Sequence, residues 1–289
     1  MIPYLIHLFI LIGVYYILAL SLQVSMGFTG LLNLAQIAFF AIGAYTSALL
    51  TLAGVPFLLS FVLAGVLALI SGFLLSLPLN KLKGDYLAVV TIGFTFIVYA
   101  ITLNWIELTR GPLGIPGIPK PDIFGYVFNS NESYLVLVTI IAIVIWIFVR
   151  AVVRSPFGRT LEAVRDDELA TKMLGKDTKK IKAISMMMAA FLAGLAGSLY
   201  AHYITFIDPS SFALMQIVPI ISIVIIGGLA SLPGTLLATI ILILLPEPMR
   251  FIGFPSSIVG PMRQILYAVI LLAVLLYRPK GFWGKVELE

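Results

Sequence analysis

The chain has 289 residues and a net charge of +5, is 61% hydrophobic and only 11% charged, and has a mean hydropathy of +1.12. A water-soluble domain of this size needs far more polar surface, so these values exclude the soluble classes and predict a polytopic membrane protein. The sequence contains no cysteine, which excludes disulfides, thiol nucleophiles and thiolate metal sites in this chain.

The apolar segments predict an all-α, polytopic bundle of transmembrane helices, about eight to ten of them, forming one domain over residues 1–289. Lys81 is the first charged residue, and because a span needs about 20 apolar residues, the stretch before it holds about three helices. Nine helices are expected, over residues 3–26, 30–53, 56–79, 86–106, 133–153, 184–206, 211–229, 231–246 and 260–277.

The seventh and eighth expected helices are the least regular. Gly227, Gly228, Pro233 and Gly234 interrupt residues 211–246, and the second helix of the pair is short. The pattern fits either two full spans or a broken, partly re-entrant segment, and both interpretations remain open at this point.

The basic residues predict the orientation, because cytoplasmic loops carry an excess of lysine and arginine. With residues 154–182 in the cytoplasm, 14 of the 18 basic residues lie on that side and 4 lie outside. The cytoplasmic set is Lys81, Lys83, the nine basic residues of 150–182, Arg278, Lys280 and Lys285, and the external set is Arg110, Lys120, Arg250 and Arg263. Nine spans then place the amino terminus outside and the carboxyl terminus inside.

Two further segments lie outside the expected helices. Residues 107–132 form a long external loop whose prolines at 112, 116, 119 and 121 forbid a continuous helix and favour extended backbone. The tail over residues 277–284 mixes aromatic and basic residues, which is typical of an anchor at the membrane interface.

No charged residue lies near the middle of an expected span, whereas proton-coupled transporters and ion pumps usually keep one there. His202 is interpreted as a packed interfacial residue rather than a proton relay. Small residues recur at every fourth position in Ala190, Gly194 and Ser198, which predicts close helix packing.

Neutral polar residues inside the spans allow two interpretations. They either hydrogen-bond between helices, at about 1 kcal/mol each, or line a path for a polar solute. The candidates for a translocation path are Asn33, Gln36, Tyr45, Thr91 and Thr95. Asn33 and Gln36 are three residues apart, so we expect them to share one helix face.

Residues 154–182 are the only long charged segment, and they predict two short capped helices. The signals are Ser155 and Pro156 for the first start, Asp166 or Asp167 for a second helix over 168–174, Gly175 for its end, and Asp177 for entry into the next span.

The same segment is a candidate docking element, because the chain has no Walker A pattern and uphill transport would need an energy source in another chain. Leu161, Val164, Leu169, Met173 and Leu174 would give the short helices an apolar surface suited to another protein's groove. The alternative is a basic loop resting on anionic lipid, which the interleaved acidic residues disfavour.

Four stretches, in order, carry a resemblance to a known family. They are GFTGLLNLAQIAFFAIGAYT over 27–46, LKGDYLAVVTIGF over 82–94 followed by RGPLGIPGIP over 110–119, the segment 155–175, and YRPKG over 277–281. With them the chain resembles permeases of the branched-chain amino-acid ABC transporter family. The second and fourth stretches are similar to its LivM-like branch rather than its LivH-like branch.

The resemblance implies a multi-pass permease in the cell membrane of a prokaryote, paired with a second, LivH-like permease. It also implies two ABC ATPase subunits, an external solute-binding protein and a branched-chain amino acid as cargo. On this resemblance, the residues that couple the permease to the ATPases are Ser155, Pro156, Gly158, Arg159, Glu162, Ala163, Arg165 and Gly175.

Other functions remain as alternatives. The same architecture carries urea or short amides in related permeases, and a stand-alone secondary transporter or a purely structural membrane subunit is a further reading. No residue constellation supports catalysis, a cofactor, a metal ion or nucleic-acid binding, so we expect a transport subunit that is not an enzyme.

Overall fold

The computed structural model describes residues 2–79, 85–123, 125–248, 256–278 and 280–284. Its long helices are α1 (Ile2–Leu22), α3 (Phe57–Leu79), α4 (Asp85–Asn104), α6 (Asn131–Arg154), α9 (Thr178–Ile204) and α13 (Ser256–Tyr277). Three apolar helices are shorter, α2 (Gln36–Leu52), α10 (Ile217–Gly227) and α11 (Leu232–Leu244). Short helices also lie between the apolar ones in the described part of the chain, namely α5 (Ile106–Thr109), α7 (Pro156–Asp166) and α8 (Glu168–Met173).

The helical architecture agrees with the sequence, but the number of spans is not confirmed. Among the described residues, six helices are long and apolar enough to cross a membrane, namely α1 with its continuation, α3, α4, α6, α9 and α13. The other three expected helices are present, yet each is below the length of a full span.

The first boundary differs from the prediction. Helix α1 continues as a π-helix, η1 (Gln23–Phe28), and α2 begins only at Gln36, so the expected helix over 30–53 loses its first turns. Gly30 takes a left-handed φ of 71°, which ends the helical path after η1. Asn33 is therefore outside the helix, and the prediction that it shares a helix face with Gln36 was wrong.

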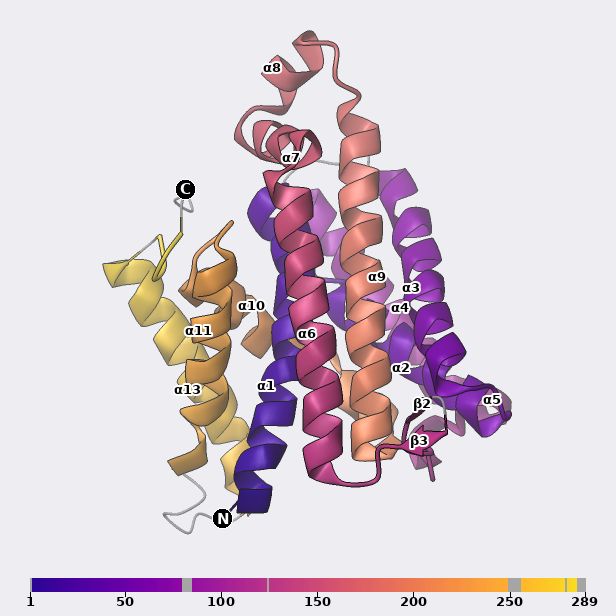
Figure 1. Ribbon diagram of the computed structural model, residues 1–289. Helices are drawn as coiled ribbons and strands as arrows, with labels where there is room; N and C mark the ends of the chain where they lie inside the picture. The colour runs from indigo at the N-terminus through magenta and orange to yellow at the C-terminus, as the bar shows by residue number, and fades with distance from the viewer. Residues whose placement is uncertain (1, 80–84, 124, 249–255, 279, 285–289) are drawn as a thin grey trace.

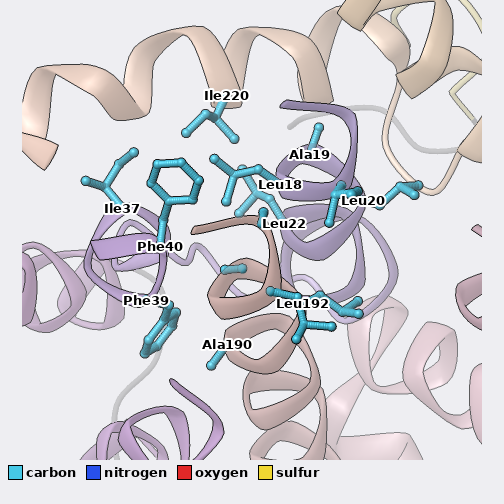
Figure 2. Close-up of a cluster of buried hydrophobic side chains, with 14 of the residues drawn as sticks. Leu18, Ala19, Leu20, Leu22, Ile37, Phe39, Phe40, Ala190, Leu192 and Ile220 are labelled. Carbon is cyan, nitrogen blue, oxygen red and sulfur yellow. The ribbon is translucent and has the colours of Figure 1, made fainter. Parts of the chain in front are cut away.

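The core lies where α1, α2, α9 and α10 meet. Figure 2 shows Leu18 and Leu22 of α1 with Phe40 of α2, Leu192 of α9 and Ile220 of α10 gathered around one apolar volume. All of these side chains are buried. Their burial fixes the four helices relative to one another.

The predicted close packing of small residues is confirmed at the α2–α9 crossing. A Cβ placed on Gly43 would lie 2.1 Å from the carbonyl oxygen of Gly194, and one on Gly197 would lie 2.1 Å from that of Phe40. Helix backbones thus touch without side chains between them, as small-residue stripes allow.

The segments that connect the long helices lie at the two ends of the bundle (Figure 1). Helices α7 and α8 lie at one end, and the start of α1, α5 and strands β2 (Asp122–Ile123) and β3 (Tyr126–Val127) lie at the other. This arrangement fits the predicted charge asymmetry for the described basic residues. Lys81, Lys83, Arg250 and Lys285 lie outside the described residues.

The proline-rich connection over 107–132 forms no continuous helix, as predicted. It contains α5, a 3₁₀ turn η2 (Gly111–Leu113) and short strands. Strand β1 (Ile115–Pro116) pairs antiparallel with β4 (Phe206–Ile207), with Ile115 opposite Ile207. Strands β2 and β3 form a separate antiparallel pair. The loop is thereby attached to the end of α9.

The segment over 211–246 is broken rather than a pair of full spans. The 3₁₀ turns η3 (Pro209–Phe212) and η4 (Leu214–Gln216) precede α10, whose 11 residues reach only about half the thickness of a bilayer core. The tail caps this half-helix, because the backbone N–H groups of Phe282 and Trp283 donate to the carbonyls of Ile226 and Gly227 at 2.8 and 3.3 Å.

Candidate functional site

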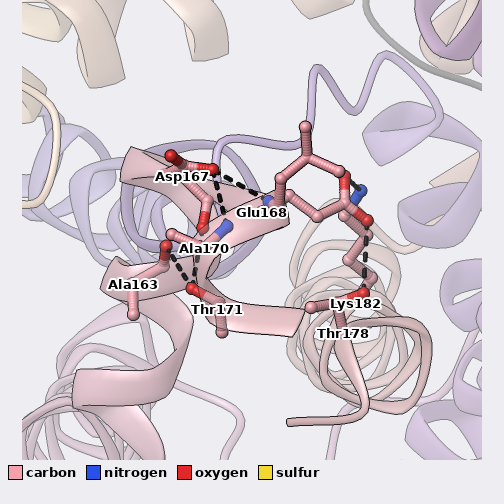
Figure 3. Close-up of polar contacts among 8 residues, drawn as sticks. Ala163, Asp167, Glu168, Ala170, Thr171, Thr178 and Lys182 are labelled. Atoms are coloured by element: carbon pink, nitrogen blue, oxygen red, sulfur yellow. Dashed lines mark hydrogen bonds and ion pairs between the residues drawn. The ribbon is translucent and has the colours of Figure 1, made fainter. Parts of the chain in front are cut away.

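The charged segment folds as two short helices whose caps match the sequence signals. Ser155 Oγ accepts from the backbone N–H of Gly158 at 3.3 Å, with Pro156 in the first helical turn. Asp167 Oδ1 accepts from the N–H groups of Leu169 and Ala170 at 2.8 and 2.9 Å (Figure 3). Of the two aspartates offered by the sequence, Asp167 is therefore the cap.

The end of this segment also agrees with the prediction. Gly175 takes a left-handed φ of 78° after α8. Asp177 caps α9 by accepting from the backbone N–H of Lys180 at 3.2 Å. That hydrogen bond lowers the pKa of the Asp177 carboxyl below its usual value, so the cap is charged at neutral pH.

We call residues 155–175 the α7–α8 unit, and it is tied to the bundle by a few polar contacts. Thr171 donates to the carbonyl of Ala163 at 2.8 Å, which folds α8 back on α7. Glu168 forms an ion pair with Lys182 at 2.5 Å and accepts from Thr178 at 3.3 Å (Figure 3). Glu168 therefore attaches the unit to the first turns of α9.

The apolar surface of the unit is smaller than the sequence suggests. Leu161 and Val164 were expected on the docking surface, but both are buried beneath α7, with exposures of 0% and 4%. Leu169, Met173 and Leu174 are exposed at 62%, 88% and 81%. The exposed apolar side chains thus gather on and just after α8.

The proposed coupling residues do not all face the same way. Pro156, Arg159 and Gly175 are exposed, and Glu162 and Ala163 are half-buried. Gly158 is buried, and a Cβ there would lie 2.0 Å from the carbonyl oxygen of Val153, so only glycine fits the turn between α6 and α7.

Arg165 points into the protein instead of outward. Its Nη1 donates to the carbonyl of Gly27 at 3.0 Å, its Nη2 contacts Asp166 at 2.8 Å, and its side chain is 13% exposed. Gly27 belongs to the π-helix η1, so α7 contacts the point where α1 loses regular helical geometry.

Sequence reasoning missed the role of Gln23, which sits one turn earlier in η1. Its Nε2 donates to the carbonyl of Gly228 and to Thr235 Oγ1, both at 2.9 Å, and its Oε1 accepts from Ala230 N–H at 3.0 Å. Gln23 is fully buried and holds the turn between α10 and α11. π-helical turns often mark functional positions, but no local sequence signal announces one here.

Four of the five predicted path residues surround the non-helical stretch between η1 and α2. Asn33 Nδ2 donates to Gln36 Oε1 at 3.1 Å, Thr91 Oγ1 accepts from Leu34 N–H at 3.1 Å, and Thr95 donates to the Leu34 carbonyl at 3.1 Å. Non-helical backbone at membrane depth needs such partners. These side chains thus stabilise the break between helices.

Tyr45 is the exception among the five. It lies further along α2, and its ring packs against Phe212 with centroids 5.7 Å apart. Its hydroxyl is buried and has no hydrogen-bond partner among the described residues. The structure therefore does not bring Tyr45 together with the other four.

His202 is buried and packed, as the sequence interpretation expected. Its Nδ1 lies 2.7 Å from the carbonyl of Pro119, and its Nε2 lies 2.9 Å from the hydroxyl of Ser47. A carbonyl only accepts, so Nδ1 carries the proton and Nε2 accepts from Ser47. The residue fastens the proline-rich loop to α2 and α9.

A second feature that sequence reasoning missed is an ion pair between Glu247, just after α11, and Arg263 in α13. Arg263 Nη2 lies 3.2 Å from Glu247 Oε1, and the hydroxyl of Tyr4 donates to Glu247 Oε2. The two charges are 16 residues apart, Glu247 three residues after the end of α11 and Arg263 in the first half of α13. The sequence shows two opposite charges, but only the structure shows that they are close enough to pair.

Fold and site together define a multi-pass membrane protein with short helices at one end and polar contacts inside. Residues 4–275 match the family model described as "Branched-chain amino acid transport system / permease component". The chain belongs to this family. Its members and relatives are transport permease subunits and not enzymes.

Individual relatives support the same placement. The chain is 36% identical to the high-affinity branched-chain amino acid transport system permease protein LivM of Escherichia coli K12, covering 93% of this chain and 67% of that protein. It is 26% identical to a probable LivM of Methanocaldococcus jannaschii, covering 93% and 90%. Identity to LivH of Salmonella typhimurium is 24%, covering 95% and 92%. The resemblance to the LivM-like branch is confirmed, and no solved structure matches the chain.

Proposed function

We propose that the chain is the permease subunit of an ATP-driven ABC importer that moves branched-chain or other hydrophobic amino acids across a prokaryotic cell membrane. An external solute-binding protein delivers the cargo, and a LivH-like permease completes the membrane core. Two separate ABC ATPase subunits hydrolyse ATP. Family membership supports this proposal, together with a sequence that lacks a Walker A pattern.

The α7–α8 unit is the observation that carries the proposal. Capped helices outside the apolar bundle display Leu169, Met173 and Leu174, three large apolar side chains that are more than half exposed. Clustered apolar side chains at an exposed surface favour protein docking. A short helix of this kind fits a groove in the cytoplasmic ATPase subunit.

Hydrogen bonds of Arg165 and Gln23 connect the α7–α8 unit to the two short helices α10 and α11. Arg165 bonds the backbone of Gly27, and Gln23 in the same π-helix bonds Gly228 and Ala230 in the turn of the two short helices. When ATP-driven closure moves the α7–α8 unit, these bonds transmit the displacement to α10 and α11. Arg165 is on this view an internal coupling residue, and the docking surface is formed by others.

The experiment uses proteoliposomes that hold the chain with all its partners. It measures leucine uptake, ATP hydrolysis and the amount of ATPase subunit bound to the permease. Met173→Glu places a charge in the docking surface and should abolish ATPase association. Leu113→Glu, a matched change at a residue 79% exposed at the other end, should leave association intact. Arg165→Gln should keep the complex together but lower uptake per ATP hydrolysed. Normal association and uptake in Met173→Glu would refute the docking role.

Other cargoes and other energy sources need their own tests. A ligand screen on the partner binding protein separates branched-chain amino acids from urea and short amides. Uptake by the purified single chain, driven by an ion gradient, would favour a secondary transporter instead.

A further inference from the structure

The Glu247–Arg263 ion pair faces a cavity of about 300 Å³ between α1, α10, α11 and α13. Its walls combine apolar side chains with hydroxyl, amide and charged groups. The lining residues used below are Leu11, Tyr15, Ile223, Ile243, Gln264 and Tyr267. A volume near 300 Å³ is at the lower end of the range for small-molecule sites.

The charges in this cavity are unusual for their position. Arg263 is the fourth residue of the apolar span Gly260–Tyr277 and its side chain is 33% exposed, whereas Glu247 is only 8% exposed. Charged groups in such segments are costly, and where they occur they face cavities, pair with each other and mark solute pathways. A charge pair beside a cavity at this end of the bundle is therefore a candidate site for a charged solute.

The arginine also has an unused donor. Arg263 Nε is buried and has no hydrogen-bond partner among the described residues, while its Nη2 contacts Glu247. A guanidinium presents its N–H donors in a planar fork suited to a carboxylate, so Nε and the fork can take a second carboxylate.

We propose that this cavity is a binding site for a zwitterionic α-amino acid with an apolar side chain. The α-carboxylate binds Arg263, the α-ammonium binds Glu247, and the side chain lies against Leu11, Ile223 and Ile243. The hydroxyls of Tyr15 and Tyr267 complete the polar wall, and Gln264 lines the cavity without a contact assigned to the ligand. The inference rests on the proposed transport of amino acids and adds the site in this chain that holds them.

Electrostatics select the zwitterion over simpler ligands. Arg263 and Glu247 neutralise each other in the empty cavity, and a ligand with both charges forms two pairs in place of one. A carboxylate or an ammonium alone would leave one protein charge without a partner in a low-dielectric site, which is strongly unfavourable. An uncharged amide gains neither pair.

The absence of cysteine from the sequence allows a direct test. In the complete transporter, Gln264→Cys places one thiol in the cavity, and its reaction with a maleimide is followed on this chain by mass spectrometry. L-leucine should slow labelling, by about twofold at half-saturation. Leucinamide and 4-methylpentanoate, which each lack one charge, should protect far less at equal concentration. Leu113→Cys at the exposed loop should be labelled at the same rate throughout.

Charge variants test the same site through transport. Arg263→Gln and Glu247→Gln should each lower leucine uptake about tenfold or more, because a ligand charge and a protein charge both lose their partner. Matched changes at exposed positions, Arg278→Gln and Glu132→Gln, should stay within about twofold of the wild type. Arg263→Lys should recover part of the loss, since it keeps the charge without the fork.

Several outcomes would overturn the site. Labelling that leucine does not slow, or that all three compounds slow equally, rules out zwitterion recognition. Protection by vesicles containing anionic phospholipid but not by leucine assigns Arg263 to a headgroup. If the Arg263→Gln chain does not assemble into the transporter, the labelling of Gln264→Cys still tests whether leucine binds in the cavity. A wild-type transporter without ATP-driven leucine uptake would instead refute the proposed function.

Discussion

On one side of the bundle α9 touches α2 and α3 through backbone atoms. On the other side α10 and α11 touch each other at Gly227 and Gly234, but hydrogen bonds from Gln23 hold their turn to η1, and an ion pair joins Arg263 of α13 to Glu247. In the most apolar stretch of α9, 67% of the residues are buried, whereas in that of α13 none is. Close-packed backbones have no alternative arrangement of similar energy, whereas exchanged hydrogen bonds do. The contrast indicates a close-packed scaffold on one side and, on the other, two short helices that pack on each other and are attached to η1 by side-chain hydrogen bonds.

The largest expected effect is on the scaffold side. Gly43→Ala places a methyl group 2.1 Å from the Gly194 carbonyl, where only backbone stands in its way, and should lower the free energy of unfolding by about 3 kcal/mol. Gly93→Ala, in α4 with open space around it, should raise that free energy by up to about 1 kcal/mol. Chemical denaturation in detergent measures both, and equal effects would contradict a close-packed scaffold.

Gln23→Leu tests the junction between the two sides. The substitution removes three hydrogen bonds to the α10–α11 turn, at roughly 0.6 kcal/mol each in a membrane protein, so we expect a loss of about 2 kcal/mol. Leucine uptake, measured at equal amounts of folded protein, should also fall below that of the wild type. Asn104→Leu, at an exposed amide, serves as the control. Unchanged uptake would remove Gln23 from the coupling route.

A smaller effect is expected at the break before α2. Thr91→Val keeps the shape but takes away the acceptor of Leu34 N–H, which should cost about 1 kcal/mol. The matched change Thr139→Val, at an exposed threonine bonded only to its own helix, should cost less than half of that. Equal unfolding energies for the two variants would show that Thr91 does not hold the break.

The smallest effect is expected on the outer face of α13. Leu272 is 59% exposed, so Leu272→Ala should change the free energy of unfolding by less than about 0.5 kcal/mol. Leu199→Ala in α9, at a fully buried position, should cost about 2 to 5 kcal/mol. A large loss of stability in Leu272→Ala alone would reverse the ranking of the two sides.

Much of the fold was predictable because its signals are local. The caps at Ser155, Asp167 and Gly175 depend on side chains and backbone within a few residues, and each formed as expected. The small-residue stripe on α9 likewise led to close packing. The orientation of Arg165 and the burial of Leu161 were not predictable, since both depend on what lies beneath α7.

The sequence by itself determined a lipid-embedded helical protein, the position of its apolar segments and the two capped helices in its one charged segment. These follow from hydropathy, charge and capping, which act over short distances along the chain. Only the tertiary structure decided that Gln23 of η1 hydrogen-bonds the α10–α11 turn, that α10 is a half-helix, and that Glu247 and Arg263 line the same cavity. Each of those features joins residues far apart in sequence, and the energy of a buried polar group depends on the partner that folding supplies.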